Sequence, residues 1–144
     1  MTTNRTADLG LLLIRLMVGV VFVYHGQGKL FGGIEGFAGA LQSMGVPAPQ
    51  LAAWAAALSE FLGGLVLIAG VAFRYALWPL VFTMLVASFK AHGGRFSLQD
   101  GGMEFALTLG VVVAGLALTG PGAFALERWL PWGRDRGGRA GQPS

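Results

Sequence analysis

Four long stretches of this chain carry almost no ionisable side chains, and this feature limits the fold more than any other. A helix that crosses the ~30 Å hydrocarbon core of a membrane needs about 20 apolar residues, with a range of about 17–25. The four stretches cover residues 9–31, 51–73, 75–91 and 103–119. Strands that span a membrane alternate apolar and polar residues, whereas these stretches are apolar on all sides. The sequence therefore predicts an all-α integral membrane protein, a four-transmembrane-helix bundle.

The low content of charge supports this class and excludes others. Charged residues make up 12% of the 144 residues, about half of the ~25% that is usual in soluble domains. This composition argues against a soluble enzyme, a disordered chain and a nucleic-acid-binding domain. The length suits one domain. We expect residues 1–132 to form the transmembrane domain and residues 133–144, rich in Gly and Arg, to form a disordered basic cytoplasmic tail.

The positions of the basic residues predict the orientation in the membrane. Loops on the cytoplasmic side are enriched in Lys and Arg. Counting both sides places six basic residues with the chain termini and three on the opposite side, so we expect both termini in the cytoplasm. Arg15 interrupts the first apolar stretch and no small-x-small cleavage site follows Tyr24, so we expect an uncleaved first helix. The six are Arg5, Arg74, Arg128, Arg134, Arg136 and Arg139, and the three are Lys29, Lys90 and Arg95.

The connection between the first two apolar stretches, residues 32–50, has a helical pattern of its own. Ile34, Phe37, Leu41 and Met44 fall on one stripe, and polar residues lie elsewhere. A short helix lying in the membrane interface fits this pattern. An ordinary packed loop is the alternative.

Seven ionisable side chains fall at or near membrane depth, where such groups are costly and usually mark a functional site. Depth estimated from the helical rise of ~1.5 Å per residue places Glu60 near the membrane midplane and Arg15 about 6–8 Å from it in depth. We therefore expect Arg15 to be the counter-charge of Glu60. The seven residues are Arg15, His25, Lys29, Glu60, Lys90, His92 and Glu104.

The arrangement predicts a polar cavity that opens to the outside of the membrane. Imidazole changes its charge near neutral pH, and a carboxyl group removed from water holds its proton more readily, so the cavity suits proton exchange. A quinone head group also fits, because polar side chains can donate to its carbonyls and apolar walls can pack on its ring. We expect no metal site, since His25, His92, Glu60 and Glu104 lack the usual ligand spacing. Without any cysteine, the chain by itself has no thiol, disulfide or iron–sulfur chemistry.

Several of these residues lie in motifs that resemble the DoxX family. The motifs are RLMVG at 15–19 with FVYHGQGKLF at 22–31, GVPAP at 45–49, LSEFLGG at 58–64, and a glutamate, Glu104, that opens the last helix. The resemblance implies a small four-helix protein of the bacterial inner membrane. It also implies a link to quinone-dependent oxidation of sulfur compounds or to oxidative stress. By position, the polar helix residues of the family fall on Arg15, His25, Lys29, Glu60 and Glu104.

Together these observations predict a membrane subunit of a quinone-linked oxidoreductase system. Glu60 would handle protons, Arg15 would balance its charge, and Glu104 would relay protons outward. His25, Lys29 and His92 would bind the quinone or an anionic substrate. Two alternatives stay open, a non-enzymatic membrane scaffold for a soluble redox enzyme and a small transporter of an anionic or protonatable solute. Beyond the lipid bilayer we expect a homo-oligomer or a soluble redox partner protein, and no nucleic acid.

Overall fold

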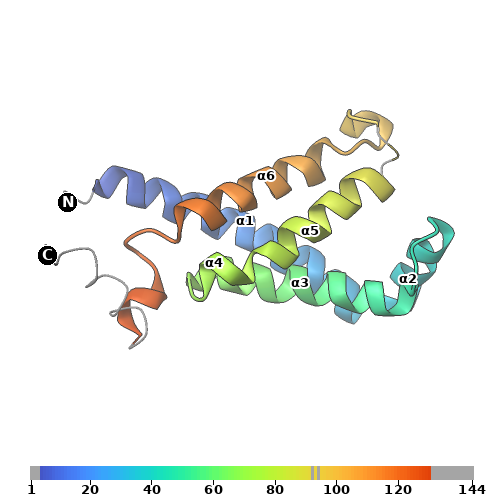
Figure 1. Ribbon diagram of the computed structural model, residues 1–144, viewed down its shortest axis with the longest axis horizontal. Coiled ribbons are helices and arrows are strands. Elements are labelled where there is room, and N and C mark those ends of the chain that lie inside the picture. Colours follow the sequence, from blue (N-terminus) through green and yellow to red (C-terminus); the bar gives the residue numbers. More distant parts are fainter. Residues whose placement is uncertain (1–3, 92, 94, 131–144) are drawn as a thin grey trace, which may run out of the picture.

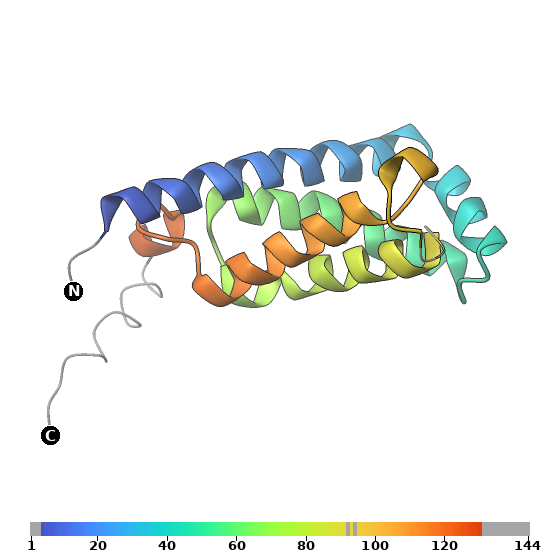
Figure 2. The same cartoon turned by 90° about the horizontal axis from the view of Figure 1, so that it is seen from above.

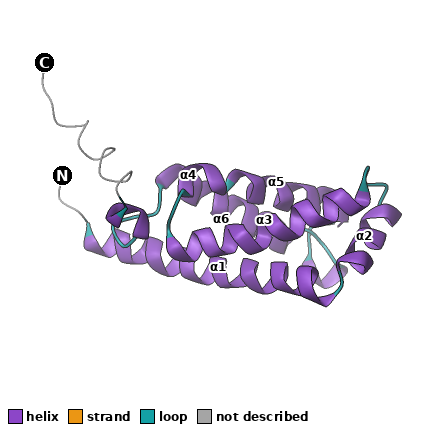
Figure 3. Ribbon diagram, turned by 90° about the horizontal axis from the view of Figure 1, so that it is seen from below, coloured by secondary structure: helices purple, strands orange, loops and turns teal. Residues whose placement is uncertain are grey.

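The computed structural model describes residues 4–91, 93 and 95–130, and within these residues every regular element is a helix (Figure 3). The expected all-α fold is therefore confirmed. Helices α1, α3, α5 and α6 run along the bundle, and α2 lies across one of its ends (Figures 1 and 2). The elements are α1 (Arg5–Gly32), α2 (Ile34–Ser43), α3 (Pro49–Ala69), α4 (Phe73–Ala76), α5 (Trp78–Val86), η1 (Ala87–Ala91), η2 (Leu98–Asp100), α6 (Glu104–Thr119) and η3 (Leu126–Trp129).

The helix boundaries follow local chemistry. The side chain of Asn4 accepts a hydrogen bond from the Ala7 amide and caps the start of α1. Pro49 occupies the first turn of α3, where a missing N–H costs little. Helix α3 ends at Ala69, earlier than the expected residue 73, because the following Gly70 adopts a left-handed backbone with φ 69°. Helix α6 ends at Thr119, as Gly120 and Pro121 predict.

The third apolar stretch is less regular than expected. Its helix α5 begins at Trp78, with Pro79 in the first turn as predicted, and a turn at Leu77 separates it from the short α4. The last five residues, Ala87–Ala91, form a π-helical turn in which the buried Ser88 hydroxyl donates to the Met84 carbonyl at 2.7 Å. Such wider turns often occur beside functional sites.

Glycines bring α1 and α3 into close contact. A Cβ atom added to Gly19 would lie 2.9 Å from the Gly64 carbonyl oxygen, and one added to Gly26 would lie 2.4 Å from the Phe61 nitrogen. Contact this close between backbones requires residues without side chains, as is common between membrane helices. The two contacts also set the height of α3 against α1, because Gly26 lies level with Phe61 and Gly19 lies against the turn between Gly64 and Ile68.

The outer surface of the bundle is apolar, as expected of a protein in a membrane. Helices α1 and α3 are long and apolar enough to cross one, and only 22% and 33% of their most apolar windows are buried in the bundle. Helix α6 is apolar but shorter. Exposed side chains such as Leu13, Phe82 and Leu118 therefore face outward, while an inner cluster of apolar residues holds the helices together. That cluster includes Phe22, Leu67, Phe73, Leu77, Leu80 and Val113.

The two ends of the bundle differ. Helix α2 confirms the helix expected between the first two apolar stretches; it packs against α3, and Ala38 is its buried residue. We call this the α2 end. Helix α1 begins and α6 ends at the opposite end, which we call the termini end (Figure 1). Which end faces the cytoplasm stays a prediction, and the proposed tail, residues 133–144, lies outside the described residues.

Candidate functional site: an ion pair in a cavity at the α2 end

The central feature of the site is an ion pair between Lys29 and Glu60. The Lys29 ammonium lies 2.5 Å from each carboxylate oxygen of Glu60 and donates to both. Lys29 comes from the last turn of α1 and Glu60 from the middle of α3. The Glu60 residue is 3% exposed, whereas 26% of the Lys29 side chain is exposed. The carboxylate is therefore buried in the bundle and its counter-charge lies nearer the surface.

The expected pairing of Arg15 with Glu60 is wrong. The close contacts between α1 and α3 place Glu60 level with the last turns of α1, and Arg15 lies opposite Gly70 instead. Ten residues of α3 separate Glu60 from Gly70, a rise of about 15 Å. The depth of each residue in the membrane was predicted from the ends of its apolar stretch. That estimate does not include the axial shift between neighbouring helices. Lys29 is the counter-charge of Glu60.

Arg15 instead holds the segment that follows α6. Its guanidinium donates to the carbonyl oxygens of Pro121 at 3.1 Å and Phe124 at 2.5 Å. Asp8, two turns earlier on α1, accepts a hydrogen bond from the Ala123 amide at 2.8 Å. Arg15 is 2% exposed, and its Nε lacks a hydrogen-bond partner among the described residues. These contacts are structural and lie at the termini end, away from the ion pair.

A cavity of about 170 Å³ lies beside the ion pair. Helices α1, α3, α5 and α6 all contribute to its wall, together with the π-helical turn. Most of that wall is apolar, with polar groups from three residues: His25, Lys29 and Glu60. The lining residues are Phe22, His25, Lys29, Glu60, Met84, Ala87, Phe105, Ala106 and Leu109.

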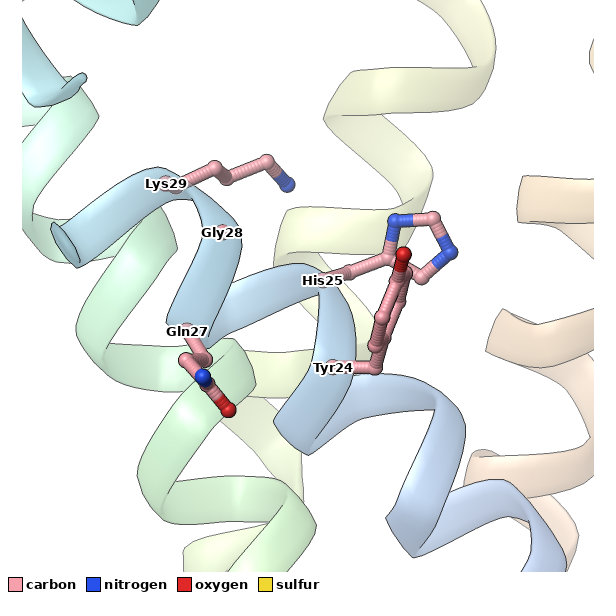
Figure 4. Close-up of a pocket in the computed structure, with 5 residues that line it drawn as sticks. All are labelled: Tyr24, His25, Gln27, Gly28 and Lys29. Atoms are coloured by element: carbon pink, nitrogen blue, oxygen red, sulfur yellow. The ribbon is translucent and has the colours of Figure 1, made fainter. Parts of the chain in front are cut away.

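His25 lies at the exposed side of this cavity. Its ring is 6.1 Å from that of Phe105 on α6 and 5.8 Å from that of Tyr24, the latter in an edge-to-face arrangement. Figure 4 shows His25 and Lys29 leaving α1 on the same side, with Gln27 pointing away. A shallower hollow of about 370 Å³ lies over Gly28, lined by α1 residues alone. Because one helix forms it, it offers fewer convergent groups than the ion-pair cavity.

Helix α2 contributes a residue that the sequence argument did not assign to the site. The Lys29 ammonium lies 4.9 Å from the centre of the Phe37 ring, within the range of a cation–π contact. Lys29 thus contacts both Glu60 and Phe37. The helical stripe containing Phe37 was visible in the sequence, but its pairing with Lys29 depends on how α2 folds back. The same holds for Phe22, Met84 and Phe105 in the cavity wall.

The remaining predicted site residues lie elsewhere. The Glu104 carboxylate accepts a hydrogen bond from the Leu98 amide at 2.7 Å and so organises the loop before α6; it does not line the cavity. Lys90 is exposed on the π-helical turn. His92 lies outside the described residues. Among the described residues, no group of three His, Asp or Glu side chains could hold a metal ion.

The chain is similar to one family of known proteins and to two individual proteins. The DoxX family model matches residues 10–93. The inner membrane protein YqjF of Escherichia coli is 34% identical over 135 residues, covering 88% of this chain and 96% of that protein. The Bacillus subtilis protein named "Putative oxidoreductase CatD" is 30% identical over 136 residues, covering 93% of this chain and 96% of that protein. No solved structure matches significantly.

Proposed function

The chain belongs to the DoxX family of bacterial inner-membrane proteins, and from this premise we propose that it is the membrane subunit of a quinone-linked oxidoreductase system. The Bacillus subtilis relative bears the name "Putative oxidoreductase CatD", which supports the redox part of the proposal. One structural observation carries the rest. A buried carboxylate and its lysine partner line a cavity with apolar and aromatic walls.

The size and chemistry of the cavity suit a quinone head group. Its volume of about 170 Å³ is smaller than the ~300–1,000 Å³ of clefts that take drug-sized ligands. That space accommodates one substituted ring but not its tail. Phe22 and Phe105 offer ring faces, and His25 offers a hydrogen-bond donor or acceptor for a carbonyl oxygen.

The chain contributes binding and proton handling rather than electron transfer. A bound quinone would supply two-electron chemistry coupled to the uptake of two protons. The chain has no cysteine and therefore no thiol to supply electrons, so they would come from a soluble redox partner protein. Glu60 would hold or release a proton at the cavity floor, and Lys29 would be its counter-charge. His25 would hold a carbonyl oxygen of the quinone by a hydrogen bond.

The proposed topology places four spans in the membrane, formed by α1, α3, the α4–α5–η1 stretch and α6. Both termini lie in the cytoplasm, α2 lies in the outer interface, and the protein assembles as a homo-oligomer. The excess of Lys and Arg that the sequence assigns to the side of the chain termini, six against three, supports this orientation. An outward proton relay through Glu104 is also part of the prediction. No contact with the cavity supports it, since Glu104 bonds the loop.

Measuring bound quinone tests this function. The protein is purified in mild detergent, incubated with a short-chain ubiquinone or menaquinone, and the quinone that remains bound is extracted and counted per chain. We expect near-stoichiometric binding in the wild type and at least a tenfold loss of affinity in Glu60→Gln and His25→Ala. Glu35→Gln, an exposed glutamate on α2, is the matched control and should bind normally. Absence of binding in the wild type would refute the proposal and favour the scaffold or transporter alternative.

A further inference from the structure

We propose that the ion-pair cavity opens sideways into the hydrocarbon of the membrane, through a portal between α1 and α6 formed by His25 and Phe105. The ligand would then be a lipophilic molecule with a single polar head, taken up from the bilayer rather than from water. This inference rests on the proposed function for the use of the site. The path itself follows from the burial and contacts of the residues around the cavity.

The route from the α2 end is covered. Lys29 lines the cavity, and its ammonium contacts both the Phe37 ring of α2 and the two Glu60 oxygens. A ligand that arrived along the bundle axis would have to displace an ion pair and a cation–π contact together. Helix α2, which carries Phe37, packs against α3 across this end (Figure 2). Direct entry from water at this end is therefore unfavourable.

The side of the cavity between α1 and α6 is open by comparison. The floor is buried, with Phe22 at 1% exposure, Glu60 at 3% and Met84 at 6%. His25 is exposed and Phe105 is 44% exposed, and both line the same cavity. The two rings are in contact, with their planes tilted by 55° and their centres 6.1 Å apart. Rotation of either side chain would uncover the opening of the cavity between α1 and α6.

This opening faces hydrocarbon and not water. Helix α1 has 28 residues and is about 42 Å long, so a ~30 Å hydrocarbon core centred on it leaves about four residues outside at each end. His25, seven residues before the last residue of α1, then lies about 5 Å inside the core. Tyr24 beside it is 75% exposed, and a Cβ atom added to Gly28 would meet no other atom within 4 Å. The portal is therefore surrounded by lipid-facing surface.

The portal selects for a particular ligand. A charged or strongly hydrated molecule would lose its water before it reached any compensating group, which is costly. A ring that carries carbonyl or hydroxyl groups is accepted by the aromatic walls and by His25, and its apolar tail remains in the bilayer outside. Phe105 and His25 are thus specificity-determining residues for membrane-dissolved amphiphiles.

Photolabelling tests the portal without any quinone. The wild-type protein in lipid nanodiscs is irradiated with a phenyl diazirine that dissolves in the bilayer, and the modified residues are mapped by mass spectrometry. A charged, water-soluble diazirine is the comparison. We expect the lipophilic probe to modify the buried Phe22, Met84 or Ala106 and the charged probe to modify them at least tenfold less. Floor residues that stay unlabelled while Tyr24 is labelled, or equal labelling by both probes, would overturn the proposal.

Closing the portal gives the matched second test. Because the chain has no cysteine, His25→Cys/Phe105→Cys can be bridged by a short, reducible bifunctional thiol reagent. Phe31→Cys/Phe61→Cys is the control, since it starts from the same helix and its rings lie 6.2 Å apart, against 6.1 Å for the portal pair. Bridging the portal should lower floor labelling at least tenfold, reversibly on reduction, and bridging the control should not. Unchanged labelling with the portal bridged would overturn the proposal.

The two proposals fail in different ways. Floor labelling that depends on the portal, without any quinone binding, would uphold the side entry and refute the quinone function. Quinone binding that depends on Glu60, with a floor that the lipophilic probe never reaches, would uphold the function and refute the side entry.

Discussion

Removing the Lys29 ammonium should destabilise the bundle far more than removing an exposed lysine. The substitution Lys29→Met keeps most of the side-chain length but leaves the Glu60 carboxylate, 3% exposed, without its two hydrogen bonds. Loss of one partner of a buried ion pair typically costs about 3–5 kcal/mol. Because 26% of the Lys29 side chain is exposed and part of its charge is already solvated, we take the lower end, about 3 kcal/mol.

Removing the carboxylate should cost less. In Glu60→Gln the group left without its ion-pair partner is the Lys29 ammonium, which retains Phe37, the amide oxygen of Gln and access to water. We expect a loss of about 1 kcal/mol in the free energy of unfolding. In the double variant Lys29→Met/Glu60→Gln no charge is left uncompensated, and the loss should be about 2 kcal/mol. The cycle therefore gives a coupling energy of about 2 kcal/mol, within the range for residues in contact.

Reversible unfolding in mixed micelles, followed by circular dichroism as the denaturing detergent is titrated, measures these values. Lys90→Met removes an exposed lysine and should change the free energy of unfolding by no more than about 0.5 kcal/mol. The reasoning is refuted if Lys29→Met and Lys90→Met are equally stable, or if the effects of the two site substitutions simply add.

Two other substitutions test the packing that positions the site. Arg15→Met removes two charge-assisted hydrogen bonds to carbonyl oxygens and should lower the free energy of unfolding by about 3 kcal/mol. Proteolysis of residues 120–130 should become faster, while quinone binding per folded chain is retained. Loss of quinone binding would mean that the two ends of the bundle are coupled. Gly26→Ala places a Cβ 2.4 Å from the Phe61 nitrogen and should cost at least about 1–3 kcal/mol by overpacking. Gly28→Ala adds a Cβ that meets open space, and it should be neutral or slightly stabilising through helix propensity. If both alanine substitutions shift the midpoint of unfolding in denaturing detergent equally, the close contact of α1 with α3 is contradicted.

Local sequence patterns were sufficient to predict the class of this protein. Runs of apolar residues of membrane-spanning length allow helices and exclude an ordinary soluble core. Pro79 and the Gly120–Pro121 pair marked helix ends, because proline lacks an N–H and glycine adopts a left-handed backbone. The family motifs, which include His25 and Glu60, were also visible in the chain. These are local properties, and they do not depend on how one helix is placed against another.

The partners of the charged residues were decided only by the tertiary structure. Counting residues from the ends of apolar stretches brought Arg15 near Glu60, but the glycine contacts set α3 at a different height and brought Lys29 there instead. The segment after α6 then folds back to supply carbonyl partners for Arg15. Likewise, Phe37 and Phe105 joined the site from helices whose placement no local pattern specifies. A buried charged side chain needs a partner wherever it lies, and the packing of the helix surfaces decides which partner it contacts.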